Sequence, residues 1–191
     1  MKRVFKYLLK LLGWKVIEPP IPETKCIILG VPHTSIWDFV IAYMYYHSMG
    51  EKAYVLIKKG FFKWPFSPVL KAMGGIPVDS GKGASLVRQV IAEFGKKEKL
   101  HLAIAPEGTR RGTANWKTGF HTIAKAVDVP VYLGYFDCGK KEIGRGKKFE
   151  LTDDPKEDIR RIQQIYSKMG IVGKHPEQFI LPDNLLTASE K

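Results

Sequence analysis

The chain has 191 residues, enough for one domain with a sizeable core, and its 45% of hydrophobic residues is ordinary for a globular protein. Lys and Arg outnumber Asp and Glu by 31 to 19, and the net charge of +12 indicates a polyanionic partner: anionic lipid, an acidic carrier protein, a phosphorylated substrate or nucleic acid. No run approaches the roughly 18–20 apolar residues of a membrane-spanning helix, so we expect no transmembrane span.

The two cysteines, Cys26 and Cys138, both lie in apolar runs that are typical of strands. We therefore expect buried free thiols rather than a disulfide, which is the usual state in a reducing cytosol. The Cys and His residues show no spacing typical of metal ligands, so the sequence predicts no metal site.

Residues 1–17 predict an amphipathic helix with five cations and no acidic residue. Lysines recur every fourth residue on one face, and apolar side chains line another (Phe5, Leu8, Leu9 and Leu12). Such a helix is typical of proteins that lie on an anionic membrane surface, although amphipathic helices also pack on their own core. Lysines interrupt the apolar stretch and no small-residue cleavage site follows, which disfavours a signal peptide. We expect a peripheral protein at the cytoplasmic face of a membrane.

Strand-like and helical patterns alternate along the rest of the chain. Apolar runs typical of strands cover residues 27–31, 53–57, 76–78, 101–105 and 129–136, and helical patterns cover 36–48, 67–73, 85–96 and 117–127. A short edge strand at 149–151 and a polar helix at 154–169 follow, before a frayed tail that begins at about residue 185. This alternation predicts an α/β fold: one domain with a largely parallel central sheet flanked by helices.

A histidine and a carboxylate follow the first of these strands. In one continuous helix His33 and Asp38 would face different directions, so they meet only if His33 lies in a loop and Asp38 in the first turn of the next helix. Asp38 would then orient the imidazole, and His33 could act as a general base. Ser35 and Asp38 also fit the S-x-x-D capping box, in which Asp38 would only cap the helix. Both alternatives stay open.

Four segments, taken in order, resemble the glycerolipid acyltransferase family, whose best-known members are the 1-acylglycerol-3-phosphate acyltransferases. They are the H-x-x-x-x-D of His33 and Asp38, the G-G-I-P-V-D at 74–79, the E-G-T-R at 107–110 and the V-P block at 129–134. The first or third alone would be weak evidence, but both in order around the glycine block are specific. The resemblance spans residues 27–137 and implies an acyltransferase domain over 25–182.

The resemblance implies phospholipid biosynthesis: a fatty acyl group moves from a thioester donor, acyl-CoA or acyl-carrier protein, to a hydroxyl of a lysophospholipid-type acceptor without a cofactor. His33 would be the general base and Asp38 would orient it. The acceptor-binding turn would consist of Glu107, Gly108, Thr109 and Arg110, with the Arg110 guanidinium forking two hydrogen bonds to a phosphate. Backbone amides of residues 34–36 or of the Gly108 turn are the candidate oxyanion donors.

Three positions depart from the family pattern. Pro32 and Gly134 replace a common Asn and Pro, which we expect to be neutral. Ser80 stands where the family has an arginine that is credited with binding the acceptor's phosphate. Lys82, in a glycine-flanked turn, is our first candidate to replace it, and Lys58, Lys59 and Arg111 are further candidates.

An aromatic block at 61–66 could line an acyl-chain groove, dip into a lipid interface or pack in the core.

Two other function classes compete with acyl transfer. A thioesterase would use the same His33 and Asp38 to activate water, and a basic nucleic-acid-binding protein would account for the charge of +12. Because the cations spread along the chain and no recognition fold is evident, we expect no nucleic acid partner.

Overall fold

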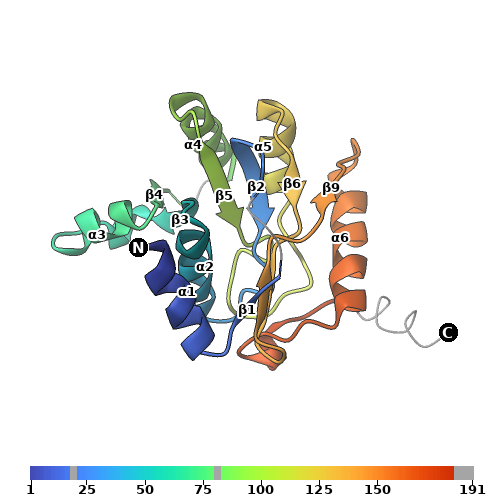
Figure 1. Cartoon of the computed structure of the whole chain (residues 1–191). Helices are drawn as coiled ribbons and strands as arrows, with labels where there is room; N and C mark the ends of the chain where they lie inside the picture. The colour runs from blue at the N-terminus through green and yellow to red at the C-terminus, as the bar shows by residue number, and fades with distance from the viewer. Residues whose placement is uncertain (18–20, 80–82, 183–191) are drawn as a thin grey trace.

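The main sheet has six strands in the order β4-β3-β5-β2-β6-β9 (Figure 1). In chain order they are β2 (Lys25–Leu29), β3 (Ala53–Lys58), β4 (Gly75–Val78), β5 (Leu100–Ile104), β6 (Val131–Tyr132) and β9 (Lys148–Phe149). All neighbours are parallel except the edge pair β6 and β9. This computed structural model describes residues 1–17, 21–79 and 83–182. The expected largely parallel sheet is confirmed.

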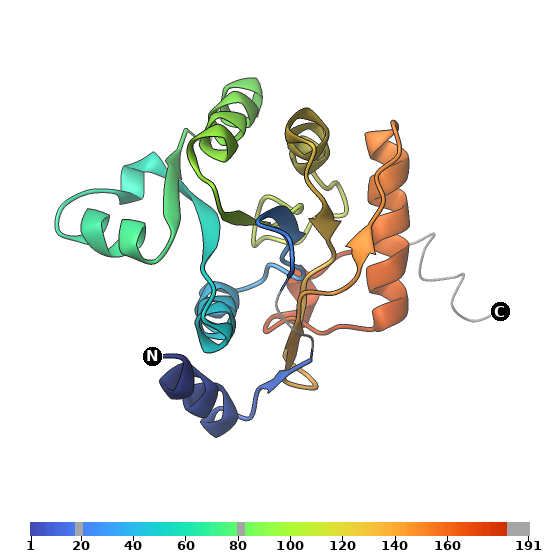
Figure 2. The same cartoon turned by 45° about the horizontal axis from the view of Figure 1, so that its top comes forward.

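Helices cover both faces of the sheet (Figures 1 and 2). They are α1 (Lys2–Leu11) and α2 (Ile36–Met49) on one face, and α4 (Gly83–Lys96), α5 (Gly119–Val127) and α6 (Pro155–Met169) on the other, with α3 (Phe66–Ala72) leading into the edge strand β4. The alternation of side chains along β2 builds the two cores. Ile27 and Leu29 join the cluster with α4, α5 and α6, whereas Cys26 and Ile28 join the cluster with α1 and α2. The predicted fold class is confirmed.

The expected single strand at 129–136 is wrong. The chain instead leaves the main sheet after β6 and enters a second sheet of order β1-β8-β7, formed by β1 (Lys15–Val16), β8 (Glu142–Gly144) and β7 (Tyr135–Asp137). The break lies at Gly134, where a Cβ atom would come within 2.5 Å of the Ile28 side chain and 2.8 Å of the Leu29 carbonyl oxygen. Only a glycine fits this crossing over β2.

Both cysteines are free thiols, as expected. Cys26 is buried, and burial raises the pKa of its thiol to about 12. Cys138 is only partly buried. Among the described residues, no helix has the length and apolar character needed to cross a lipid bilayer.

The first helix, α1, lies along α2 (Figure 1). The Phe5 ring contacts the Tyr43 and His47 rings at centroid distances of 5.8 and 5.2 Å, and Leu9 is 1% exposed. The predicted apolar face of α1 therefore packs mainly on the core, through Phe5, Leu8 and Leu9, and is not a free surface for lipid. Its fourth member, Leu12, is 44% exposed.

A different stripe of α1 faces solvent. Val4, Tyr7 and Leu11, spaced three and four residues apart, are all more than half exposed. The helix thus has a core-facing side, an exposed apolar stripe and a basic side. Membrane contact by α1 stays a prediction, and this stripe is the part of the helix that could make it.

Leu9 and Leu11 offer a matched pair for testing the packing of α1. We expect Leu9→Ala to lower the free energy of unfolding by roughly 2–4 kcal/mol, because it leaves a cavity between α1 and the core. Leu11→Ala should change it by less than about 0.5 kcal/mol, because that side chain is exposed. Chemical denaturation measures both, and equal midpoints for the two variants would contradict the packing of α1 on α2.

Candidate active site

Three neighbouring parallel strands, β3, β5 and β2, end at the same edge of the sheet, toward the lower part of Figure 1. Leu29 at the end of β2 pairs with Ile104 at the end of β5, so the loops that follow begin side by side. These loops carry His33 and Glu107. Ligands of open α/β sheets bind beyond the carboxyl ends of the strands, and the two motifs meet there.

His33 lies in the loop after β2, and Asp38 lies in the first turn of α2, the arrangement in which they can meet. His33 Nδ1 is 3.4 Å from Asp38 Oδ2. The same carboxylate oxygen accepts hydrogen bonds from the backbone N–H groups of Thr34 (2.8 Å) and Ser35 (2.7 Å). Ser35 caps the helix and completes the capping box. One carboxylate therefore caps α2 and also contacts the imidazole, and the role of His33 as a general base stays a prediction.

The imidazole remains accessible while its partner does not. The His33 side chain is 33% exposed, whereas that of Asp38 is 5% exposed. Because Nδ1 faces Asp38, Nε2 is the ring nitrogen left to meet a ligand. Contacts of this kind are often long in unliganded sites and shorten in the substrate complex.

Glu107 joins the E-G-T-R turn to the His33 loop. Its Oε1 accepts a hydrogen bond from the His33 backbone N–H at 2.9 Å, and the residue is 5% exposed. Oε2 is buried and has no hydrogen-bond partner among the described residues. Burial raises the pKa of the Glu107 carboxyl to about 7, although the hydrogen bond from His33 acts in the opposite direction. The family resemblance implied only that Glu107 belongs to the acceptor-binding turn, and the structure adds this bond to the His33 loop.

The rest of the E-G-T-R turn is open to solvent. Gly108 has a φ of +65°, which favours glycine, and its N–H donates to the Ala105 carbonyl oxygen at 3.1 Å. The Thr109 hydroxyl accepts from the Arg111 backbone N–H at 3.1 Å. Arg110 is exposed, and its guanidinium pairs with no carboxylate among the described residues. The turn therefore presents an uncommitted guanidinium.

The candidate substitutes for the missing arginine are only partly placed. Lys58 is the exposed last residue of β3, the strand next to β5, and exposed Lys59 follows it. Both therefore belong to the same sheet edge as the two motifs. Lys82, like Ser80, lies outside the described residues.

The segment after α6, residues 171–181, contacts both motif loops. The sequence did not indicate these contacts. The His175 N–H donates to the Thr34 hydroxyl at 3.4 Å. With its amide nitrogen turned toward the two carbonyls, Gln178 donates to Thr34 O (3.1 Å) and Arg110 O (2.5 Å). The fit is close, since a Cβ atom on Gly173 would lie 2.8 Å from the Thr34 side chain. No sequence signal marks these contacts, because they join residues that are far apart in the chain: His175 and Gln178 lie more than a hundred positions after Thr34, and Gln178 lies 68 positions after Arg110.

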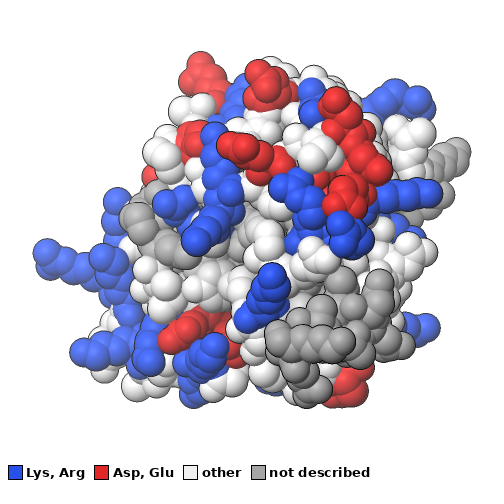
Figure 3. All heavy atoms as spheres, turned by 90° about the vertical axis from the view of Figure 1, so that its right-hand side faces the viewer, with Lys and Arg blue, Asp and Glu red and all other residues white. Residues whose placement is uncertain are grey.

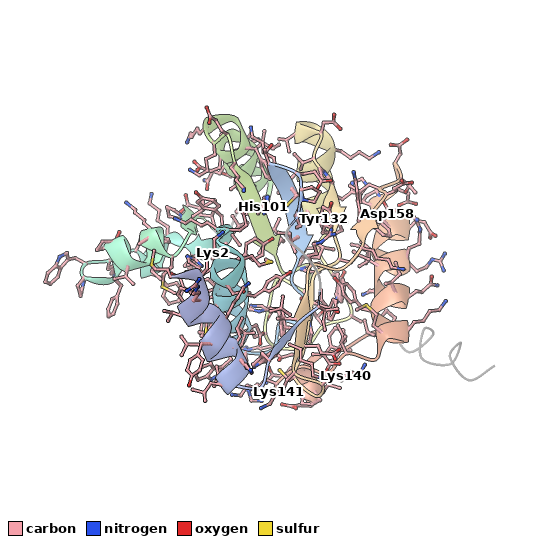
Figure 4. The ribbon with its side chains drawn as sticks, in the orientation of Figure 1. Lys2, His101, Tyr132, Lys140, Lys141 and Asp158 are labelled. Atoms are coloured by element: carbon pink, nitrogen blue, oxygen red, sulfur yellow. The ribbon has the colours of Figure 1, made fainter. Side chains whose placement is uncertain are left out.

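A groove of 540 Å³ opens beside Asp38. Its walls are mostly apolar and come from the end of α1, the start of α2, β7 and the segment after α6, through Leu12, Trp37, Ile41, Phe136, Cys138 and Val172. Lys141, at the foot of Figure 4, also lines the groove, and its ammonium donates to the Leu12 carbonyl oxygen at 3.0 Å. No residue of the aromatic block at 61–66 lines this groove, so that block does not form its wall.

Two buried histidines elsewhere make structural contacts. His101 Nε2 lies 2.7 Å from the Glu23 carbonyl oxygen (Figure 4). His121 Nε2 lies 3.0 Å from the Thr152 carbonyl oxygen and 3.3 Å from Asp158 Oδ2. No group of three or more Cys, His, Asp or Glu residues in the described part of the chain could hold a metal ion.

The sequence profile of the Acyltransferase family matches residues 16–133, which include both motif loops. The chain belongs to this family. Among solved structures it resembles the 1-acyl-sn-glycerophosphate (LPA) acyltransferase PlsC from Thermotoga maritima, with a TM-score of 0.58 and 13% identity over 91% of this chain and 80% of that one. At that identity the likeness shows the fold alone. No curated protein sequence matches the chain. The segment at 171–181 lies beyond the part that the family profile covers.

The raised pKa of Glu107 predicts a pH-dependent stability. The folded protein binds the Glu107 proton more tightly than the unfolded chain, so this group should lower the free energy of unfolding as pH rises from about 4.5 to about 7. We expect a loss on the order of 1–3 kcal/mol over this window, relative to the neutral variant Glu107→Gln. Denaturation of both proteins across pH measures the difference, and parallel profiles would contradict it.

Proposed function

We propose that this acyltransferase moves a fatty acyl group from a thioester donor, acyl-CoA or acyl-carrier protein, to a hydroxyl of a lysophospholipid-type acceptor. The observation that carries the proposal is the contact of His33 with buried Asp38, which also lines the apolar groove. An imidazole oriented by a carboxylate provides a base near neutral pH, and the groove suits an acyl chain.

In the proposed reaction, His33 Nε2 takes the proton of the acceptor hydroxyl as its oxygen attacks the thioester carbonyl carbon. A C–O bond forms, and the carbonyl oxygen carries the negative charge of the tetrahedral intermediate. When the C–S bond breaks, the proton on His33 passes to the departing thiolate. Asp38 stabilises the transient imidazolium through Nδ1, so the enzyme needs no nucleophile of its own.

The oxyanion requires a donor that is not already in use. The Thr34 and Ser35 amides donate to Asp38, and the Gly108 amide donates to Ala105, so these three candidates are occupied. The Ile36 N–H, at the start of α2, has no acceptor among the described residues. We therefore assign Ile36 as the donor from this loop.

The acceptor's polar end belongs, in this proposal, at the E-G-T-R turn. The exposed guanidinium of Arg110 is free to bind a phosphate in a bidentate manner, and Gly108 leaves its backbone accessible. Thr109 lies in the same turn, and Glu107 has a buried oxygen that finds no partner in the described part of the chain. Lys58, Lys59 and Lys82 would supply positive charge in place of the arginine that Ser80 replaces.

Because its substrates are lipids, we place the protein peripherally on an anionic membrane at its cytoplasmic face. The exposed stripe of α1 and the five cations of residues 1–17 support this placement. Membership in the acyltransferase family argues against the nucleic-acid-binding alternative.

His33→Ala and Asp38→Asn should both lose transfer activity while staying folded. For His33→Ala we expect turnover to fall by a factor on the order of 10²–10⁴, which is the usual contribution of a general base to the rate. Ser35→Ala is the control: it should cost about 1 kcal/mol of stability through the lost cap but keep the chemistry. Assays of thiol release with acceptor present measure all three. Near wild-type turnover by a folded His33→Ala variant would contradict this mechanism. Rapid thiol release without acceptor would indicate a thioesterase.

Arg110→Ala should raise the acceptor's KM with donor saturated, because it removes the guanidinium that would bind the phosphate. Arg88→Ala, an exposed arginine on α4, is the control and should have no effect. Because Ser80 replaces an arginine, we also expect weaker dependence on phosphate than in relatives that keep it, which a comparison of phosphorylated and unphosphorylated acceptors measures. Unchanged KM and kcat in Arg110→Ala would rule out the anion site.

A further inference from the structure

The aromatic protrusion, residues 59–72, extends from the edge of the main sheet (Figures 1 and 2). It consists of the 3₁₀ helix Lys59–Phe61, a short loop and α3, and it connects β3 to β4. Its large apolar side chains face solvent: Trp64 is 88% exposed, Phe61 and Phe66 are each 65% exposed, and Val69 is 56% exposed. Core packing is therefore wrong for these side chains, and none of them lines the groove beside Asp38.

The protrusion is also positively charged. The chain from Lys52 to Val78 contains five lysines and no acidic residue, and four of these lysines lie in or next to the protrusion and are exposed: Lys58, Lys59, Lys63 and Lys71. The opposite side of the molecule differs, because there acidic and basic side chains are interspersed (Figure 3). The charge of the protrusion is thus a local property and not only the excess of the whole chain.

Exposed aromatic rings among cations, without acids, match the interface of an anionic bilayer. Tryptophan is enriched at the level of lipid headgroups, where its ring is partly apolar and its N–H stays hydrated. Lysines near such a surface are attracted by the anionic headgroups. Scattered apolar residues on a surface are ordinary, but four on one projecting segment mark an interaction site. A projecting shape suits a planar interface, which needs no complementary groove.

We propose that the aromatic protrusion inserts Phe61, Trp64 and Phe66 into the headgroup region of an anionic lipid bilayer, with Lys63 and Lys71 over the phosphates. This inference rests on the proposed membrane partner, not on the acyl-transfer chemistry. The protrusion starts directly after Lys58, at the carboxyl end of β3, and so begins at the sheet edge that carries the motif loops before it leads to the start of β4. The α1 helix lies on the same side of the molecule in both ribbon views (Figures 1 and 2).

Vesicle sedimentation of the full-length protein tests the proposal. We expect binding to vesicles of equal parts phosphatidylglycerol and phosphatidylcholine, and much weaker binding to phosphatidylcholine alone. The triple variant Phe61→Ser, Trp64→Ser and Phe66→Ser should bind the anionic vesicles on the order of tenfold more weakly or worse, because it loses most of the insertable apolar area. Ile165→Ser, a partly exposed apolar residue on α6, is the control and should bind like the wild type.

Four further measurements separate the possible outcomes. The triple variant should keep the wild-type unfolding midpoint, since the substituted side chains are exposed, and should keep its turnover on an acceptor below its micelle concentration. A variant of the α1 stripe, Val4→Ser with Tyr7→Ser and Leu11→Ser, reports how much of the binding belongs to α1. Lipid quenchers in the bilayer should quench tryptophan fluorescence less in Trp64→Phe than in the wild type.

The proposal is overturned if the wild type does not bind the anionic vesicles, or if the triple variant binds them as well as the wild type does. It is also overturned if the triple variant abolishes a dimer, or binding of acyl-carrier protein, and leaves vesicle binding intact, because the protrusion would then be a protein interface. Turnover on the soluble acceptor stays informative in each case, so failure of the membrane contact is distinguishable from failure of the acyl-transfer mechanism.

Discussion

The hydrogen bond from the His33 backbone to the Glu107 carboxyl holds the two motif loops together at the carboxyl edge of the sheet. The two loops leave neighbouring strands, and this bond joins them directly, whereas Gln178 joins them from a third segment. Glu107 makes its link from a buried position, with one oxygen unpaired among the described residues and its pKa raised to about 7. Burial of the Glu107 carboxyl thus costs stability, and its hydrogen bond places the His33 loop beside the E-G-T-R turn. Functional sites commonly carry such a cost.

Asp38 also connects two parts of the site, but within one loop and the helix that follows it. Its carboxylate accepts two backbone N–H groups at the start of α2 and also contacts the imidazole of His33. The start of the helix and the orientation of the histidine therefore depend on one side chain. The groove beside Asp38 depends on distant parts of the chain, because α1, β7 and the segment after α6 each supply a wall.

Local patterns were enough to predict most elements of the main sheet and its helices. The apolar runs of β2, β3 and β5 and the caps of α2 and α6 act within a few residues, and the structure has these elements where the patterns indicated. The paired positions of His33 and Asp38 were also predictable, since a loop followed by a capped helix leaves few arrangements. The prediction of one strand at 129–136 was wrong because the strand breaks at Gly134, where the chain passes close to Ile28 and Leu29. These two residues lie about a hundred positions earlier, so no local pattern marks the break.

The sequence by itself determined the alternation of strands and helices, the family and the motif residues, because these depend on periodicity, caps and short spacings. Tertiary structure alone decided which apolar surfaces are buried. The face of α1 with Phe5 and Leu9 packs on α2, whereas the equally apolar Phe61, Trp64 and Phe66 stay in solvent. It also decided that Glu107 reaches the His33 loop and that Gln178 bridges Thr34 and Arg110. Hydrophobicity sets the free energy gained on burial, but only the position of distant segments decides which side chains are covered.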